Sequence, residues 1–278
     1  MRMLLLLAAV GCTEYGIQGG QDDNLGLEPE LDTAEPEPDT TEPQDSDSAE
    51  PEDTGSANDE EPPPAEAPVY AHTSAQLYEV EPSSGVRTLI GTFRDGAGTE
   101  ISPFVDIAID LEGRMYGGTF DALYRIDPFT AQVTEICEPG AGMVALTFTS
   151  DGELIAGDTQ SVHIINIANC RVTELVTEGD YQTSGDLVGL PDGYLYWTVQ
   201  GSSRDRLVRI DPLTGATTYI GDVGYSEIFG LGYDDGELLG FNSWGETLTI
   251  SPSTAAATVL ASDSGMSWYG ATTNPVEW

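Results

Sequence analysis

The sequence predicts an all-β protein built from one repeated unit of four strands. Two copies of the unit's second half are closely alike: Ala122–Ile136 reads ALYRIDPFTAQVTEI and Arg206–Ile220 reads RLVRIDPLTGATTYI. In each copy, β-branched and aromatic residues form two runs that suit a pleated sheet. The runs are joined by Asp-Pro, in which Pro presets the backbone of a turn and Asp accepts hydrogen bonds from the amides that follow. Each copy is therefore predicted to be a β-hairpin.

The first half of the unit is a second hairpin. In the second copy it runs VDIAID (Val105–Asp110), a Glu-Gly turn and RMYGGTF (Arg114–Phe120), so that the whole unit has four strands, named a to d. Two-residue Asp-Gly turns are a strong hairpin signal, because Gly accepts the positive φ that they require. Three later copies carry Asp-Gly here, at Asp151, Asp192 and Asp235.

The copies recur with the period of a β-propeller blade. Pro82, Pro128, Ile167 (in the Pro slot of the third copy), Pro212 and Pro252 are spaced 46, 39, 45 and 40 residues apart, a spacing typical of four-stranded blades. Val69–Phe93 supplies strands b to d without a strand a, whereas Trp268–Pro275 resembles a strand a with no partner behind it. We therefore predict a five-bladed β-propeller whose C-terminal strand completes the N-terminal blade, since closure removes exposed sheet edges.

The repeats LYRIDPFTAQVTEI and LVRIDPLTGATTYIG resemble a bacterial class whose units read LY-x-I-D-x-x-T-G-x-x-T-x-I-G. This class includes the NHL, YWTD and quinoprotein-type propellers. The resemblance covers Val69 to Trp278 and is weaker at HIINIANCRVTELV and TLTISPSTAAATVL. It implies a blade and says little of function, because propellers host many unrelated functions.

The first residues resemble an export signal. Positive charge at Arg2 precedes the short apolar run Leu4–Val10, which is too short to span a bilayer as a helix. Ala9–Cys12 resembles a bacterial lipobox, although Leu is commoner than Ala at its first position. The resemblance implies a lipidated Cys12, several acyl chains that anchor it stably, and, from Thr13, sorting to the outer membrane. An ordinary secretory signal is the alternative to this lipoprotein signal peptide of residues 1–12.

Residues 13–67 are predicted to form a disordered acidic tether. Residues 21–67 hold 18 Asp or Glu and no basic residue, with too little apolar surface to offset the entropy of ordering. We interpret the segment as a solvated spacer; Ca²⁺ scavenging or docking to a cationic partner are alternatives without a discrete motif. The propeller domain then occupies residues 68–278, and the whole chain resembles surface lipoproteins of Gram-negative bacteria with long Asp/Glu/Pro/Thr linkers. We expect it to be exported and anchored at the outer membrane or cell surface.

The charge of the chain excludes one class of partner. Its net charge is −39, with 48 acidic residues against 9 basic ones, all of them Arg. Nucleic-acid binding depends on basic patches that neutralise phosphates, so we expect no nucleic-acid partner.

Two further cysteines, Cys137 and Cys170, leave the redox state open. Export permits a disulfide. The repeat, however, places Cys170 in a turn and Cys137 at the far end of the preceding copy's last strand, on opposite faces of the ring. A disulfide needs Cα atoms within ~7 Å. We therefore expect two unpaired thiols, with a bridge as the alternative.

No catalytic constellation is recognisable. His72 and His163 fall on strands of different blades, without a G-x-S-x-G or H-E-x-x-H motif, and we expect packed or half-exposed rings and no zinc site. Strand a carries Asp106, Asp110 and Asp186 towards the channel. Asp106 and Asp110 share one face of one strand, which we interpret as one weak acidic spot with no matched pair across blades. Some five-bladed propellers are glycan-cleaving enzymes with channel carboxylates, so a secreted glycan-active enzyme is the alternative function. No cofactor is expected, and Ca²⁺ in the channel or a turn remains an option.

Loop aromatics favour a binding role. The d-to-a and b-to-c loops of a propeller emerge on one face, and exposed aromatics there either pack or bind. Rings flanked by hydrogen-bonding groups suit sugars or protein surfaces. The candidate ligand-binding residues are Phe104, Tyr181, Arg204, Tyr225, Trp244 and Trp268. The alternative is that these rings cover the protein's own core. We expect a monomeric, non-enzymatic module for a carbohydrate or protein ligand.

Overall fold

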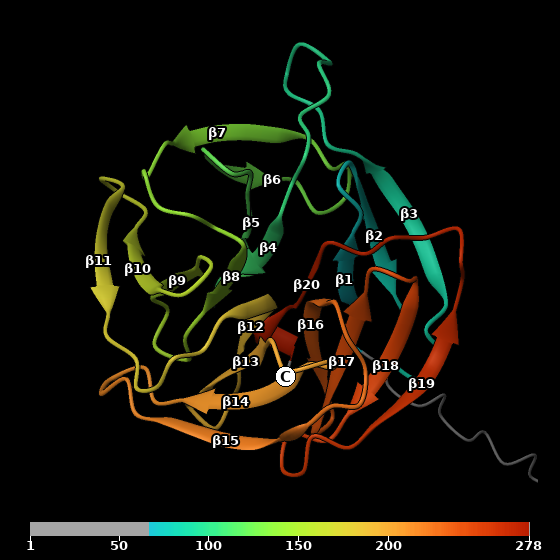
Figure 1. Ribbon diagram of the computed structural model, residues 1–278. Helices are drawn as coiled ribbons and strands as arrows, with labels where there is room; N and C mark the ends of the chain where they lie inside the picture. Colours follow the sequence, from blue (N-terminus) through green and yellow to red (C-terminus); the bar gives the residue numbers. More distant parts are fainter. Residues whose placement is uncertain (1–66, 278) are drawn as a thin grey trace, which may run out of the picture. The chain divides into compact units, whose positions relative to one another are not determined.

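The computed structural model describes residues 67–277. Cys12, the rest of the proposed signal peptide and residues 13–66 of the proposed tether lie outside this range. Within it, five four-stranded antiparallel sheets stand around a central axis (Figure 1), and the predicted five-bladed β-propeller is confirmed. None of the helices in this range is long and apolar enough to cross a bilayer.

The blades are numbered here from the N-terminus, and their strands are given from the axis outwards. Blade 1 has β20 (Gly270–Thr273), β1 (Val69–His72), β2 (Gln76–Val80) and β3 (Arg87–Thr92). Blade 2 has β4 (Asp106–Ile109), β5 (Met115–Gly118), β6 (Leu123–Ile126) and β7 (Val133–Cys137). Blade 3 has β8 (Ala145–Phe148), β9 (Leu154–Gly157), β10 (Val162–Asn166) and β11 (Arg171–Leu175). Blade 4 has β12 (Thr183–Gly189), β13 (Leu195–Val199), β14 (Arg206–Ile210) and β15 (Thr217–Asp222). Blade 5 has β16 (Ile228–Asp234), β17 (Glu237–Asn242), β18 (Glu246–Ile250) and β19 (Ala257–Ser262), and a 3₁₀ turn (Pro275–Glu277) follows β20.

The ring closes as the unmatched ends of the sequence predicted. Strand β20 pairs antiparallel with β1, in a register that places Val69 opposite Thr273 and His72 opposite Gly270. Blade 1 therefore takes its innermost strand from the C-terminus. Because both halves of this blade are needed, the first and last described strands hold one another in place.

The a-to-b turns have the predicted glycine but, in three blades, one residue more than predicted. Only Asp235-Gly236 forms a two-residue turn, in which Asp235 itself adopts a φ of 41°. In blade 2 the amide of Asp110 bonds the carbonyl of Arg114 (3.0 Å), so the loop has three residues. Such a loop needs a positive φ at its last residue alone, which Gly113 supplies at 76°.

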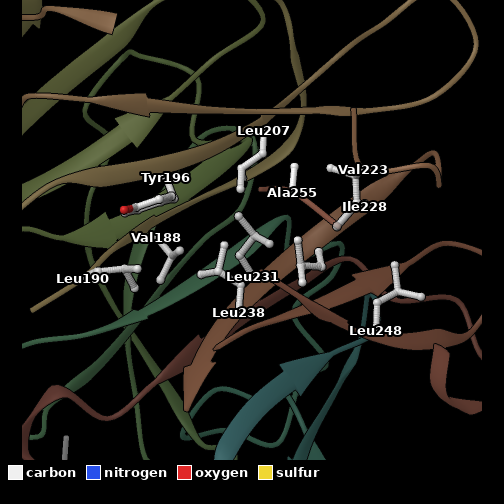
Figure 2. Packing of buried hydrophobic residues seen from close by; sticks show 11 residues of the cluster. Val188, Leu190, Tyr196, Leu207, Val223, Ile228, Leu231, Leu238, Leu248 and Ala255 are labelled. Carbon is white, nitrogen blue, oxygen red and sulfur yellow. The ribbon is translucent and has the colours of Figure 1, made fainter. Parts of the chain in front are cut away.

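The hydrophobic core is divided among the interfaces between blades. Each of five buried clusters joins the facing sides of two neighbouring blades. Figure 2 shows the cluster between blades 4 and 5, where Leu207 faces Ala255 and Val188 lies near Leu231. Side chains of strands a to c therefore alternate between two interfaces, one on each side of the blade.

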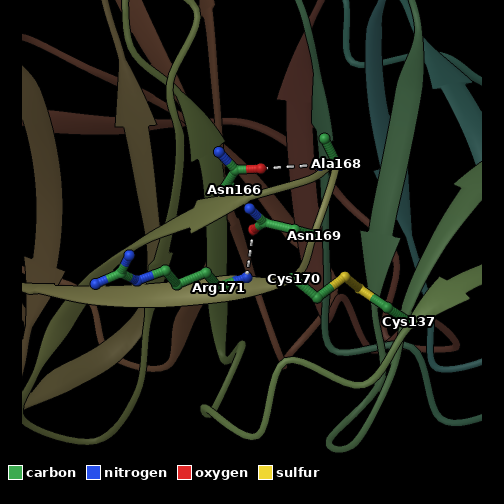
Figure 3. Close-up of a disulfide and its surroundings, with 6 residues drawn as sticks. All are labelled: Cys137, Asn166, Ala168, Asn169, Cys170 and Arg171. Atoms are coloured by element: carbon green, nitrogen blue, oxygen red, sulfur yellow. Dashed lines mark hydrogen bonds between the residues drawn. A yellow bond between two sulfur atoms is a disulfide. The ribbon is translucent and has the colours of Figure 1, made fainter.

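Cys137 and Cys170 form a disulfide (Figure 3), so the expectation of two unpaired thiols was wrong. Their Cα atoms lie 6.3 Å apart. The expectation placed the two cysteines on opposite faces of the ring. Sheets twist, however, and the end of each outer strand reaches the c-to-d turn of the next blade. The same approach recurs at the other four interfaces: Gly91 with Thr130, Val176 with Gly215, Gly221 with Thr254, and Ala261 with Gly85. Cys170 has a φ of 57° and takes the turn position that Gly or Ala takes elsewhere.

Removing this bridge should weaken the fold. For the Cys137→Ala/Cys170→Ala variant we expect the free energy of unfolding to fall by roughly 3–4 kcal/mol, because the bridge spans a sequence separation of 33 residues and so restricts the unfolded chain. Urea denaturation followed by Trp fluorescence measures the change. A reductant should shift the wild-type midpoint to that of the variant and leave the variant's own midpoint unmoved; equal midpoints under oxidising conditions would contradict the prediction.

Candidate functional site

The axis of the ring is occupied by two carboxyl groups. Strand a of each blade has a partner strand on its outer side only, so its inward backbone amides need other acceptors. Five equivalent amides, one from each blade, donate to Asp106 in β4 and Asp186 in β12. Asp106 accepts from Ile107 (2.8 Å) and Leu146 (2.6 Å), and Asp186 accepts from Leu187 (2.5 Å), Leu231 (2.5 Å) and Ala271.

Small residues make room for this pair. At the level of the two carboxyls the remaining inner strands carry Ala145, Gly230 and Gly270. A Cβ on Gly270 would lie 2.2 Å from an oxygen of Asp106 and 2.5 Å from Nε2 of His72. Only glycine fits at that position, because no real Cβ approaches other atoms so closely.

The two carboxyls share a proton. Both side chains are fully buried and hydrogen-bonded to one another, which requires one of them to be protonated. Burial raises the pKa of Asp186 to about 7. Burial also raises the pKa of Asp106 well above its ordinary value, and the negative charge of Asp186 raises it further. The expectation that the channel would hold no matched pair across blades was therefore wrong: blades 2 and 4 lie on either side of the axis, and period and spacing alone do not show that their carboxyls meet.

The histidines take the packed positions expected from the sequence. His72 is fully buried, its Nδ1 donates to the carbonyl of Thr73 (2.8 Å), and burial lowers its pKa to about 4, so the ring is neutral. His163 is half-buried, with Nε2 3.4 Å from Oδ2 of Asp158. Within residues 67–277, no group of three or more His, Cys, Asp or Glu side chains is arranged to hold a metal ion.

The six candidate ligand-binding residues separate into three groups. Phe104 and Trp268 are buried, which corrects their assignment to the binding surface. The d-to-a loops that carry them turn into the gaps between blades, where Phe104 packs on Phe93 (ring centroids 4.2 Å apart) and Trp268 packs on Phe241 (5.6 Å). Tyr181 and Tyr225 are half-buried against interblade clusters. Trp244, with 62% of its surface exposed, and the exposed Arg204 remain accessible.

A polar depression lies on the loop face between blades 4 and 5. It has a volume of about 490 Å³ and is lined by Ser184, Gln200, Gly201, Ser203, Arg204, Asp205, Ser226, Glu227 and Phe229. Two loops form it, and they are joined by backbone hydrogen bonds from Asp205 to Tyr225 (2.6 Å) and from Val223 to Asp205 (2.9 Å). Of the lining residues, the sequence pointed to Arg204 alone.

The carboxylates of the depression hold its walls together. Asp205 is buried and accepts from the Ser184 hydroxyl (2.6 Å) and the amide of Ile228 (2.9 Å). Burial raises the pKa of Asp205. Glu227 accepts a short hydrogen bond from the hydroxyl of Ser243, and its carbonyl accepts from the Ser243 amide (3.0 Å). Both acids are thus engaged by the protein itself.

Trp244 lies next to this depression along the chain. It follows Ser243, the residue that bonds Glu227, in the b-to-c loop of blade 5. The side chain of Asn242 fixes this loop by accepting from the amides of Trp244 (3.1 Å) and Glu246 (2.9 Å). The serine and glutamate residues that line the depression belong to no recognisable sequence motif. The sequence could have indicated them only through their position in the loops of blades 4 and 5.

Within residues 67–277, these features define a five-bladed β-propeller with two buried carboxyl groups at its axis and a polar depression on its loop face. The sequence matches no protein-family model and no curated protein. A chain from a nidogen/laminin complex is similar in structure, with a TM-score of 0.51 and 13% identity over 77% of this chain and 88% of that one. A protein of unknown function from Bacteroides caccae has a TM-score of 0.46 and 10% identity over 76% of this chain and 99% of that one. TolB from Acinetobacter baumannii has a TM-score of 0.43 and 15% identity over 74% of this chain and 55% of that one. At 13% identity, the similarity to the chain from the nidogen/laminin complex shows a shared fold alone.

The shared proton should make stability depend on pH. An unfolded Asp ionises near pH 4, whereas burial raises the pKa of Asp186 to about 7 and holds that of Asp106 well above its ordinary value. The free energy of unfolding should therefore fall as pH rises from about 4 to 7, where the folded state still binds protons that the unfolded chain has lost. The slope is at most about 1.4 kcal/mol per pH unit for one proton. Urea denaturation from pH 5 to 8 measures it.

The matched variant is Asp186→Asn. It should be less stable at every pH, because an amide group would face backbone donors, and it should lose the part of the slope that comes from the pair. An Asp186→Asn profile parallel to that of the wild type would contradict the raised pKa of Asp186.

Proposed function

We propose that this protein is an exported, lipid-anchored and non-enzymatic binding module that recognises a carbohydrate or protein ligand on its loop face. One observation carries the proposal: the polar depression and Trp244 lie on the opposite face of the ring from the point where the chain enters it. The chain enters at Ala67, beside a second depression of about 390 Å³ that Asp234 and Asp235 also line. The loop face therefore lies on the other side of the ring from the residue at which the described chain begins.

Export is supported by two independent features. The first is the N-terminal segment with its apolar run and lipobox-like end at Cys12. The second is the disulfide between Cys137 and Cys170, a bond that persists in oxidising compartments. The acidic segment between Cys12 and the propeller would act as a spacer from the membrane surface.

Binding is favoured over glycan hydrolysis by the state of the carboxyls. Hydrolysis of a glycosidic bond uses two carboxyl groups that flank the substrate. At the axis, Asp106 and Asp186 are fully buried and accept backbone amides. At the loop face, Asp205 and Glu227 are bonded to Ser184 and Ser243. An exposed indole such as that of Trp244 is instead typical of ligand contact.

The first test is Trp244→Ala. We expect at least a tenfold loss of affinity, about 1.4 kcal/mol, for whichever ligand the wild-type protein binds on an array of oligosaccharides and surface proteins. Phe129→Ala is the matched control, because this ring is 83% exposed but lies in the c-to-d turn of blade 2, on the other face. Array binding that survives Trp244→Ala unchanged would refute the site.

The second test addresses the anchor. Cys12→Ala should move the protein from the membrane fraction to the soluble fraction of the producing cell, because the acyl chains would have no attachment point. Metabolic labelling with a fatty-acid analogue should mark the wild-type protein and not the variant. A variant that stays with the membranes would count against lipid anchoring.

A further inference from the structure

The depression holds a positive charge that the protein leaves unpaired. In this strongly acidic chain, six of the eight described arginines have a partner. Four form ion pairs: Arg87 with Asp263, Arg94 with Glu100, Arg114 with Asp110 and Arg206 with Asp222. Two lie over aromatic rings: Arg125 over Tyr116 and Arg209 over Tyr194. Within residues 67–277, the guanidinium groups of Arg171 and Arg204 alone have neither kind of partner.

Arg204 differs from Arg171 in its surroundings. Arg171 begins the outer strand of blade 3, whereas Arg204 lines the depression, with a guanidinium nitrogen near Gly224. The two acids that line the depression, Asp205 and Glu227, form no ion pair with Arg204 and accept hydrogen bonds from other groups. Asp205 is bonded to Ser184 and to the amide of Ile228, and Glu227 is bonded to Ser243. An anion that enters the depression would therefore meet a free guanidinium with five hydrogen-bond donors.

The rest of the lining suits a sugar. Ser203, Ser226 and Gln200 offer hydroxyl and amide groups at the surface, and Phe229 offers an apolar side. Trp244, whose side chain is exposed, follows Ser243, the residue that bonds Glu227, and flat aromatic rings suit the apolar faces of sugar rings. A guanidinium pairs with a carboxylate through two parallel hydrogen bonds.

We propose that this depression binds a uronic acid residue of a short glycan, with the sugar carboxylate on Arg204. The proposal rests on the proposed function, because it uses the same loop face, and it adds the ligand class. The negative charge of the protein repels long polyanions, so the ligand is short or sparsely charged. Salt screens that long-range repulsion, with a Debye length of about 8 Å at physiological ionic strength.

The experiment is calorimetric titration of the full chain with three trisaccharides, of galacturonate, glucuronate and mannuronate, each compared with its methyl ester. The esters keep the sugar and remove the charge. We expect the wild-type protein to bind at least one acid form at least tenfold more tightly than its ester. Arg204→Gln should bind acid and ester with equal affinity, whereas Arg171→Gln should keep the wild-type preference.

The outcomes separate this inference from the proposed function. Equal affinities for acid and ester in the wild type, or an unchanged preference in Arg204→Gln, would overturn the uronate site, and loss of both ligands in Trp244→Ala would then still support the binding face. A wild-type protein that binds no trisaccharide but binds a protein through Trp244 would overturn the uronate site alone. Loss of the acid preference through misfolding is recognised by thermal melting, since Arg204 makes no contact whose removal should lower the melting temperature.

Discussion

The centre of this propeller depends on two carboxyl groups that accept hydrogen bonds from five backbone amides. Each inner strand turns one edge towards an axis without solvent, where an unpaired amide costs about 1–3 kcal/mol. Asp106 and Asp186 satisfy one amide from every blade. Two ionised carboxylates could not lie so close together in a buried site, so a shared proton belongs to the arrangement. The axis is therefore a filled polar core.

The periphery of the ring repeats a second contact. The outer strand of every blade ends against the c-to-d turn of the next, and at the interface of blades 2 and 3 this approach is covalent, through Cys137 and Cys170. Four blades also bulge near the end of the outer strand, which turns Ile90, Ile136, Ile220 and Leu260 towards the interblade clusters. Neighbouring blades are thus joined at the axis, in the gap between them and at the rim.

The loop face combines structural acids with two accessible groups of another kind. Asp205 and Glu227 fix the loops of blades 4 and 5 through Ser184 and Ser243. The two acids are hydrogen-bonded within the protein, whereas the guanidinium of Arg204 and the indole of Trp244 are exposed. The first described residue, Ala67, lies on the opposite face of the ring, beside the turn at Asp235.

The sequence by itself determined the number of blades, their strand order and the closure by β20. These predictions used local features: the alternation of side chains, the Asp-Pro and Gly turns, and the regular period. Each of these features recurs in every copy of the repeat or in most copies, so the sequence shows them directly. Tertiary structure alone decided that Asp106 meets Asp186 across the axis, that Cys137 reaches Cys170, and that Phe104 and Trp268 point into the core. These are relations between different blades, and they depend on sheet twist and on the angle between blades, which no local pattern encodes. The site follows the same division, because loop position identified Arg204 and Trp244, whereas the depression beside them exists only once two blades are packed together.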